Sequence, residues 1–422
     1  MKRKVLPLLL AGTMAASMFA GCSSEGSSSE SKGESKDGAV TLTVMGPTED
    51  QAKESGQWLQ KECKAFAKEH PEWKINFKYQ KCSEGDAKDT IVKDVDGAAD
   101  VYMFANDQIT DLVKANAISK LGGDTAKYVK DSNAKTIVNT VTYNGEIYGV
   151  PYTSNSWFMY YDKRVFSEDD VKNLDTMLTK GKVSFPISNG WYLAAFYTAN
   201  DCTFYGDGTD EKAKIDFSEK KAAPVTKYLM GLMKNENFKP DTTDDGSQGL
   251  SGMKDGSVNA FFDGNWNYGA VCEAIGEENV GTAQLPTIKI DGQEKQMKSF
   301  LGSKAIGVNP TCKRQDIAVA LAKYLGSEKA QKDHFDLRQQ APVNKNLTGT
   351  DEVKANVACD ALAKVAENTS ICQPIFGMQN FWDAAKALGK EIAGQGDEPM
   401  TEANYVEKTE AFNKQINTSV VK

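Results

Sequence analysis

The chain has 422 residues, of which 40% are hydrophobic and 26% are charged. This length suggests two or three domains, and this composition lets each bury a core, which excludes a chain that is disordered throughout. Acidic residues outnumber basic ones by 58 to 50, which gives a net charge of −8. Because nucleic-acid-binding proteins neutralise phosphates with lysine and arginine, this balance argues against a nucleic-acid partner.

The first 21 residues have the pattern of an export signal. A Met-Lys-Arg-Lys start is followed by an apolar run over 5–16 and by Ala20-Gly21 before Cys22. The run is too short to span a bilayer as a mature helix. Ala20-Gly21-Cys22 resembles a bacterial lipobox, in which the cysteine is lipidated. The sequence therefore predicts a signal peptide over 1–21 and a lipid anchor on Cys22, at the outer face of the cytoplasmic membrane of a bacterium.

Residues 22–39 are predicted to form a tether. Residues 23–38 consist of serine, glycine and charged residues with no apolar side chain. Such a segment cannot bury apolar area, so we expect it to be flexible. The globular part then begins near Val40.

Seven cysteines follow Cys22 at irregular spacing, with no Cys-x-x-Cys pair. No disulfide map follows from this pattern, and an odd number indicates mostly buried free thiols. His70 and His334 are the only histidines. We expect both at the surface, and two isolated histidines support neither a zinc site nor a Ser-His-Asp triad.

The first half of the globular part alternates strands and helices. Apolar residues at every second position indicate a strand, and apolar residues three or four positions apart indicate a helix. Asn-Gly between alternating apolar residues indicates a hairpin. On this basis we expect strands at 41–45, 73–79 and 100–105, helices at 51–69 and 109–117, and a hairpin at 143–148.

The run at 100–105 is apolar throughout, which is typical of a parallel strand buried on both faces. Ligands of such sheets bind at the carboxyl ends of the strands. This rule places Phe104, Asn106 and Asp107 at a candidate site.

From about residue 155 the alternation begins again, which predicts a second α/β domain. The apolar, glycine-punctuated run at 300–308 is long enough to cross back toward the first domain. We expect strands at 182–187, 258–262 and 280–285, and helices starting near 191 and covering 223–233, 316–325, 351–366 and 381–392.

Four segments carry a family resemblance. They are Asp100–Asp107, Tyr143–Pro151 with 158–163, 254–266, and Met378-Gln-Asn-Phe-Trp382. Together they resemble the maltodextrin-type extracellular solute-binding proteins of ABC importers. The first three are typical of the superfamily, and the last is similar to a helix start of the maltose and maltodextrin branch.

The resemblance implies a two-lobed periplasmic-binding-protein-like fold of type II. Each lobe would be a mostly parallel sheet flanked by helices, with a hinge between the lobes and a sugar in the cleft. We expect 40–153 plus 305–352 in the N-terminal lobe, 154–304 plus 353–422 in the C-terminal lobe, and hinge crossings near 152–156, 300–305 and 350–356.

Sugars present flat C–H faces, which stack on aromatic rings, and a rim of hydroxyls, which need planar polar side chains. At the positions matched by the resemblance, we expect Trp382, Trp266 and Trp191 to be stacking platforms. Tyr268 and Phe104 are further candidates. The remaining tryptophans have periodic apolar neighbours and are expected in the core; they are Trp58, Trp73 and Trp157.

Candidate polar ligands of the hydroxyls come from both halves of the chain. Asp107 matches the family's main carboxylate, and it is equally suited to cap the helix that follows. Asn155 stands where the maltose branch has glutamate, and Lys386 stands where it has arginine. Glu49 and Asp50, after the first strand, either reach the cleft or begin a solvated helix.

The resemblance implies a monomeric, non-enzymatic carrier that captures malto-oligosaccharides and delivers them to an ABC permease, with neither cofactor nor metal. Another neutral oligosaccharide is the main alternative as ligand. A glycan-active enzyme would need two carboxyls flanking one glycosidic bond. A peptide, polyamine or metal carrier and a surface adhesin that binds starch without transport also stay open.

Overall fold

The computed structural model describes residues 38–208, 210–243, 246–396 and 398–418. The expected export signal, Cys22 and most of the tether lie outside these residues. Within the described residues, no helix combines the length and the apolar character needed to cross a bilayer.

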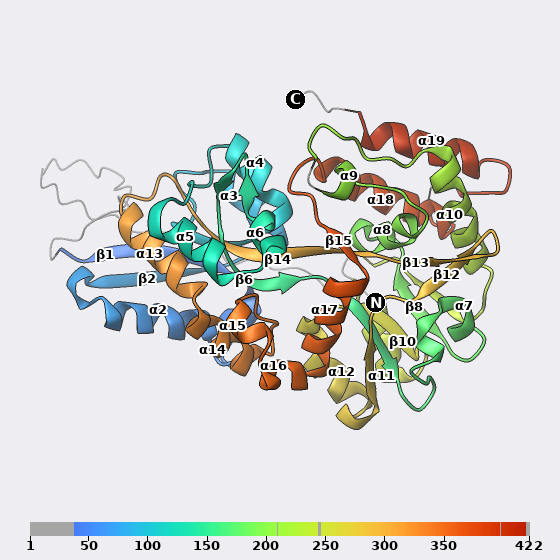
Figure 1. The fold of residues 1–422 in the computed structure, drawn as a ribbon, viewed down its shortest axis with the longest axis horizontal. Coiled ribbons are helices and arrows are strands. Elements are labelled where there is room, and N and C mark those ends of the chain that lie inside the picture. Colours follow the sequence, from blue (N-terminus) through green and yellow to red (C-terminus); the bar gives the residue numbers. More distant parts are fainter. Residues whose placement is uncertain (1–37, 209, 244–245, 397, 419–422) are drawn as a thin grey trace, which may run out of the picture.

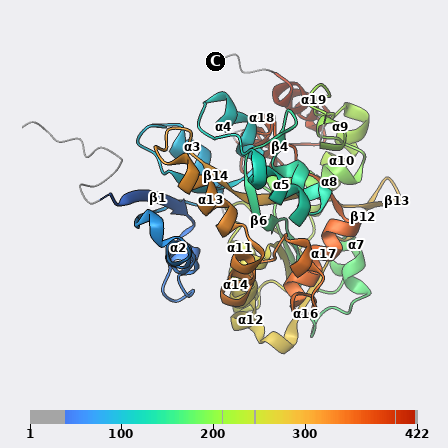
Figure 2. The same ribbon diagram turned by 60° about the vertical axis from the view of Figure 1, so that its left-hand side comes forward.

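Two β-sheets, each with its own hydrophobic core, form two lobes (Figure 1). Figure 2 shows the same separation, with β1 and α2 on one side and α10 and α19 on the other. The first sheet has the order β15-β14-β3-β1-β2, with β6 also paired to β14. Its strands are β1 (Val40–Gly46), β2 (Ile75–Lys81), β3 (Val101–Ala105), β6 (Val150–Asn155), β14 (Ser299–Val308) and β15 (Ser370–Cys372).

The second sheet has the order β11-β7-β10-β8-β9. Two further strand pairs, β4–β5 and β12–β13, lie outside the two main sheets. The strands are β7 (Phe158–Asp162), β8 (Val183–Pro186), β9 (Phe238–Asp241), β10 (Ala260–Asp263) and β11 (Val280–Ala283), with β4 (Thr142–Tyr143), β5 (Glu146–Ile147), β12 (Thr287–Ile290) and β13 (Gln293–Gln296).

The two-lobed α/β prediction is confirmed, and the strand pairing refines it. In the first sheet β1 pairs in parallel with β2 and β3, while β14 runs antiparallel to β3 and β6. In the second sheet β8 pairs in parallel with β9 and β10, while β7 runs antiparallel to β10 and β11. Both sheets are therefore mixed. Strands β6, β7 and β14 lie where the chain passes between the lobes. They join their sheets by antiparallel pairing, so they need no helical crossover, which only a parallel connection requires.

Strand β14 contributes to both cores. Phe300, near its start, packs in the second core, and Ala305, Ile306 and Val308 pack in the first. Figure 1 shows β14 running from one lobe into the other. The preceding crossing is short, because β6 ends at Asn155 and β7 begins at Phe158 in the other sheet. The residue boundaries proposed for the lobes stay a prediction.

Helices cover both sheets (Figure 1). Those named with the first core are α2 (Trp58–Glu69), α3 (Ala87–Ile91), α4 (Ile109–Lys114), α5 (Gly123–Ser132), α6 (Lys135–Thr140), α13 (Gln315–Leu325) and α14 (Glu328–Arg338). Those named with the second are α7 (Leu174–Met177), α8 (Gly190–Ala199), α10 (Glu219–Leu232), α11 (Gln248–Asp255), α12 (Tyr268–Ile275), α17 (Val357–Asn368), α18 (Gln379–Ile392) and α19 (Tyr405–Ile416). The chain also forms four short α-helices, which are α1 (Thr48–Gln51), α9 (Tyr205–Gly208), α15 (Lys345–Thr348) and α16 (Asp351–Ala355).

Two expected helices are interrupted in the structure, each for a local reason. The helix expected at 51–69 begins at Trp58, because Gly56 and Gln57 adopt positive φ angles of 82° and 54°. The helix expected at 351–366 is divided at Asn356, whose side chain accepts hydrogen bonds from the main-chain N–H groups of Ala358 and Cys359. Asparagine is among the best N-caps, so it starts a new helix there.

The core expectation is confirmed for Trp58 and Trp157, and the expectation of mostly buried thiols is confirmed for the cysteines. Trp58 and Trp157 are fully buried, and Trp73 packs against the first core. None of the seven cysteines of the described residues is in a disulfide, and Cys63, Cys202, Cys312 and Cys359 are buried. Burial raises the pKa of the Cys63 and Cys359 thiols to about 12. These thiols therefore stay protonated and unreactive at neutral pH.

Candidate binding site

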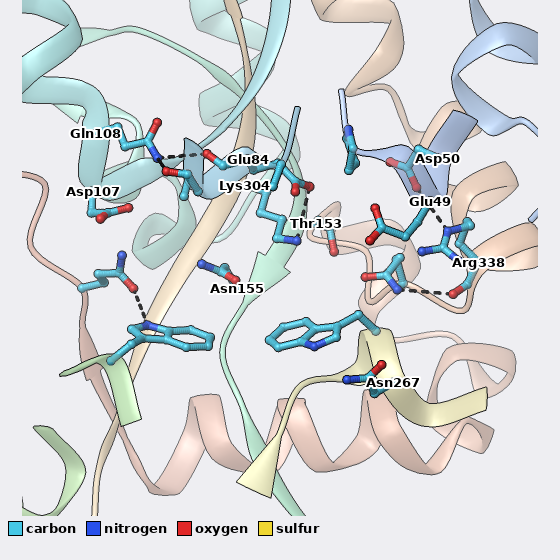
Figure 3. A pocket seen from close by; sticks show the side chains of 18 of the residues that line it. Glu49, Asp50, Glu84, Asp107, Gln108, Thr153, Asn155, Asn267, Lys304 and Arg338 are labelled. Carbon is cyan, nitrogen blue, oxygen red and sulfur yellow. Dashed lines mark hydrogen bonds and ion pairs between the residues drawn. The ribbon is translucent and has the colours of Figure 1, made fainter. Parts of the chain in front are cut away.

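A cavity of about 570 Å³ lies between the lobes and is lined by residues of both (Figure 3). The first lobe contributes mainly charged and amide side chains, from the carboxyl ends of its strands and from α14. The second lobe contributes three tryptophans, from α8, the turn after β10, and α18. The cavity therefore has an aromatic side and a polar side.

Trp191 lies in the first turn of α8, where the side chain of Asn189 caps the helix by accepting from the Trp191 N–H at 3.0 Å. Its indole Nε1 donates to Gln373 Oε1 at 3.0 Å. The ring centroids of Trp191 and Trp266 are 6.1 Å apart, and their planes are inclined by 27°. The two rings thus form adjacent platforms.

Trp266 is positioned by the turn that follows β10. A Cβ on Gly264 would lie 2.0 Å from the Trp266 ring, so the ring packs directly over this glycine. The Asp263 carboxylate accepts from Gly264 N–H and from Asn267 Nδ2, both at 2.7 Å. Burial raises the pKa of Asp263 to about 6. These contacts fix the turn that presents the ring.

Trp382 lies in the first turns of α18, and its Nε1 donates to Asp107 Oδ2 at 3.3 Å. Asp107 belongs to the short 3-10 helix Asn106–Gln108, directly after β3, so this hydrogen bond joins the two lobes. Desolvation raises the pKa of Asp107 to about 6, although hydrogen bonds from its own main-chain N–H and from Trp382 favour the ionised form. The carboxylate is therefore poised to exchange this partner for another donor.

Asp50 lies at the other side of the cavity (Figure 3). Its Oδ1 is 2.9 Å from His334 Nε2 and accepts from Arg338 Nε at 3.2 Å. Burial alone would raise the pKa of Asp50, but His334 and Arg338 hold it below its ordinary value. Its neighbour Glu49 is exposed on α1.

Lys304 and Glu84 form a further ion pair in the cavity lining. Lys304 Nζ lies 3.3 Å from Glu84 Oε1, which also accepts from Tyr152 Oη at 2.7 Å. The same ammonium lies over the Trp266 ring, 5.5 Å from its centroid. The pair therefore bridges the polar and aromatic sides.

The crossing point itself is tightly packed. Gly302 is paired with Asn155, and a Cβ on it would lie 2.3 Å from Asn106 Oδ1 and 3.2 Å from Gln373 Oε1. Asn106 Oδ1 accepts from Ser303 N–H at 3.1 Å. A side chain at position 302 would push apart the supports of Asp107 and Trp191.

The structure brings most of the expected site residues together. The following line the cavity: Glu49, Asp50, Asp107, Asn155, Trp191, Trp266 and Trp382.

Three expected residues are not among the cavity-lining residues of the described chain. Phe104 as a platform is wrong: it is 0% exposed, because both faces of β3 are covered by the first core. Tyr268 begins α12, with its hydroxyl 3.4 Å from Glu277 Oε1. Lys386 follows Trp382 by one helical turn on α18, outside the lining.

Several lining residues were not found from the sequence. His334 was expected at the surface, but it is buried, with its ring 4.2 Å from Trp58. Lys304 had a recognisable signal, a single lysine within an apolar strand. The other such residues are Pro47, Ser83, Glu84, Gly85, Ala105, Gln108, Thr153, Asn267, Arg338, Gln340, Gln373 and Gln379.

Two lobes joined by a shared strand, with an aromatic and polar cavity between them, define a two-lobed solute-binding protein. The model of the bacterial extracellular solute-binding protein family matches residues 61–361. The chain belongs to this family, whose members are extracellular and bind the solutes of transporters.

Solved structures and curated proteins resemble the chain over most of its length. A solved structure determined with acarbose is 60% identical, covers 90% of this chain and 99% of its own, and has a TM-score of 0.88. The galactooligosaccharide-binding protein of Bacillus subtilis (strain 168) is 23% identical and covers 85% of this chain and 91% of its own. The maltooligosaccharide ABC transporter solute-binding lipoprotein of Streptococcus pneumoniae (strain ATCC BAA-255 / R6) is 24% identical and covers 71% and 72%.

Proposed function

We propose that this protein captures malto-oligosaccharides outside the cell and delivers them to the permease of an ABC importer. The observation that carries the proposal is the cavity itself, which three tryptophans of one lobe line together with carboxylate, amide and ammonium groups of the other. Aromatic rings suit the C–H faces of a sugar, and planar polar groups suit its hydroxyls. The 60% identical structure determined with acarbose supports a glucose-based ligand.

In this proposal Trp191 and Trp266 stack against neighbouring sugar rings. Trp382 stacks against the sugar ring that lies near Asp107. Asp107 accepts from two sugar hydroxyls once Trp382 Nε1 releases it, as ionised carboxylates make strong hydrogen bonds. Asn155 adds an amide at the crossing. Because the contacts come from both lobes, binding favours the closed arrangement.

A different neutral oligosaccharide is the second candidate ligand. The galactooligosaccharide-binding relative covers 91% of its own length, so the same fold also serves a galactose-containing ligand in that protein. Isothermal titration calorimetry with maltose, maltotriose, maltotetraose and galacto-oligosaccharides separates the two candidates. We expect maltotriose or longer to bind best, and exclusive binding of the galacto-oligosaccharides would reject the malto-oligosaccharide proposal.

The charge pairing in the cavity supports capture rather than hydrolysis. A glycosidase needs an acid and a base or nucleophile flanking one bond. Asp50 is bonded to His334 and Arg338, and Glu84 to Lys304 and Tyr152. Intact ligand after prolonged incubation, measured by chromatography, is the expected result.

The anchoring at Cys22 is part of the proposal. A lipid on Cys22 and a tether would keep the protein near its permease, and the lipoprotein relative supports this anchoring. We also propose that the protein is a monomer. Cys22→Ser should release the protein into the medium or leave it unprocessed. Retention of a processed form at the membrane would contradict the anchor.

A further inference from the structure

Lys304 of β14 lines the cavity beside a bulge in the neighbouring strand β6. Strand β14 pairs Lys304 with Ala105 of β3 and with Thr153 of β6, and the register with β6 shifts between Lys304 and Ala305. The extra residue is Tyr152 of β6, because Ala305 pairs with Pro151. Such bulges are frequent beside functional sites. Figure 3 shows Lys304 projecting into the cavity between Asn155 on one side and Thr153 on the other.

Glu84 holds the ammonium at this position. The side chains of Lys304 and Glu84 are only 21% and 8% exposed, so each compensates the charge of the other. Glu84 is fixed in turn, because its side chain accepts from Tyr152 Oη at 2.7 Å and its main-chain carbonyl accepts from Gln108 Nε2 at 2.9 Å. The donor therefore has one defined position above Trp266.

The ammonium covers the ring face on which a sugar would stack. Lys304 Nζ is 5.5 Å from the centroid of Trp266, which leaves too little depth for a pyranose ring beneath an unmoved ammonium. A stacked sugar must therefore shift Lys304 sideways, toward the hydroxyls at the edge of the sugar ring. An ammonium has three N–H donors, so it can keep Glu84 and still donate to the sugar.

We propose that Lys304, oriented by Glu84, is a specificity-determining residue that donates charged hydrogen bonds to the hydroxyls of the sugar ring stacked on Trp266. This inference rests on the proposed function. Replacing the cation–aromatic contact with charged hydrogen bonds favours the bound state, because such bonds are stronger than a partly exposed cation–π contact. The lining cations Lys304 and Arg338 are already paired with carboxylates, which favours a neutral ligand over an anionic one.

The first test is a mutant cycle measured by calorimetry with maltotriose. Lys304→Met keeps the length and removes the donor, and we expect binding to weaken about 10-fold, or ~1.4 kcal/mol. Glu84→Gln should also weaken binding, and the double variant should lose less than the product of the two factors, because both act through one contact. Lys323→Met is the matched control, since Lys323 lies 5.7 Å from the Tyr128 ring centroid outside the cavity. It should bind as the wild type does.

A second measurement separates direct contact from a structural role. Maltotrioses that each lack one hydroxyl are compared with intact maltotriose. Removing the hydroxyl that Lys304 contacts should weaken binding to the wild type but not to Lys304→Met. A structural role would leave the deoxygenation losses unchanged in the variant. If Lys304→Met does not fold in denaturant unfolding, Lys304→Leu, which also lacks a hydrogen-bond donor, replaces it in the same comparison.

The outcomes are distinguishable. Wild-type affinity retained within twofold in Lys304→Met, with the control unchanged, overturns this inference and leaves the proposed function standing. A wild type that binds none of the malto-oligosaccharides overturns the proposed function and the role of Lys304 with it. Tighter wild-type binding of maltose 6-phosphate than of maltose overturns the hydroxyl-donor role in favour of an anion site.

Discussion

Asp50 and Asp107 are carboxylates at the two sides of one cavity, and their pKa values are shifted in opposite directions (Figure 3). Desolvation raises both. At Asp50 it is overcome by His334 and Arg338, whereas at Asp107 the side-chain donor is the neutral indole of Trp382. The difference shows that the partner, more than the burial, decides the charge state. Asp50 is thereby a structural group, and Asp107 is available to a ligand.

Breaking the Asp50 cluster should have the largest effect. Arg338→Met removes a permanent charge beside a carboxylate that is 4% exposed. We expect the free energy of unfolding to fall by about 3–5 kcal/mol, the usual cost of leaving a buried charge uncompensated. Urea unfolding without sugar measures it.

Arg314→Met is the matched control, because it breaks the exposed Arg314–Asp316 pair. This change should cost less than about 1 kcal/mol. Equal losses in the two arginine variants would mean that His334 alone balances Asp50. Because the pKa of Asp50 is lowered, the stability it contributes should be present above about pH 4 and be lost as the pH falls further.

The Asp107 side should respond in binding rather than in stability. Trp382→Ala removes both a platform and the donor to Asp107, and we expect sugar binding to weaken about 10- to 100-fold, as for aromatic hot spots. Trp157→Ala, in the second core, should instead cost about 3–5 kcal/mol of stability. Calorimetry measures the sugar affinity of each variant, and urea unfolding measures the free energy of unfolding of each. A Trp382→Ala protein that unfolds early and binds normally would make Trp382 a core residue.

The raised pKa of Asp107 predicts a pH effect of intermediate size. Since the folded state holds this proton more tightly, ionising Asp107 costs stability as the pH rises from about 4 through about 6. Asp107→Asn should therefore gain about 1 kcal/mol relative to the wild type between pH 4.5 and 7.5, given partial exposure to the cavity. Urea unfolding at both pH values measures it.

Sugar affinity should change in the opposite sense, falling in the wild type as the pH drops below about 6, because a protonated carboxyl loses an acceptor. The affinity of Asp107→Asn should change less across the same range. Parallel pH profiles of affinity in the two proteins would contradict a ligand role for Asp107.

Glu49 should have the smallest effect and marks the limit of the comparison. It lines the cavity next to Asp50 but is exposed. Glu49→Gln should change sugar affinity less than about threefold, or ~0.6 kcal/mol. Calorimetry with maltotriose measures this change, and a loss of more than about tenfold would place Glu49 on the ligand.

Much of the fold followed from periodicity, because strands and helices bury regular faces. The apolar run at 100–105 became the fully buried β3, and 300–308 became β14. The breaks at Gln57 and Asn356 were missed because each depends on one residue's φ angle or cap, which periodicity does not register.

The site was predicted best where a residue follows a strand or begins a helix. Trp266, Trp191 and Asp107 are of this kind, and all three line the cavity. The positions of His334 and Lys304 depend on their neighbours in the fold, which periodicity does not show. His334 packs against Trp58, and Lys304 lies beside a bulge in β6. Phe104 failed because both faces of β3 are covered, as its uninterrupted apolar run already indicated, so its ring stays in the first core.

The glycine at the crossing of β14 and β6 matters for any attempt to redesign this protein as a sensor for another sugar. Platforms and hydroxyl partners can be exchanged one at a time, since each lines the cavity. Gly302 cannot, because the supports of Asp107 and Trp191 meet against its bare Cα. A library that varies the cavity should therefore hold position 302 constant, however far that residue lies from the sugar being exchanged.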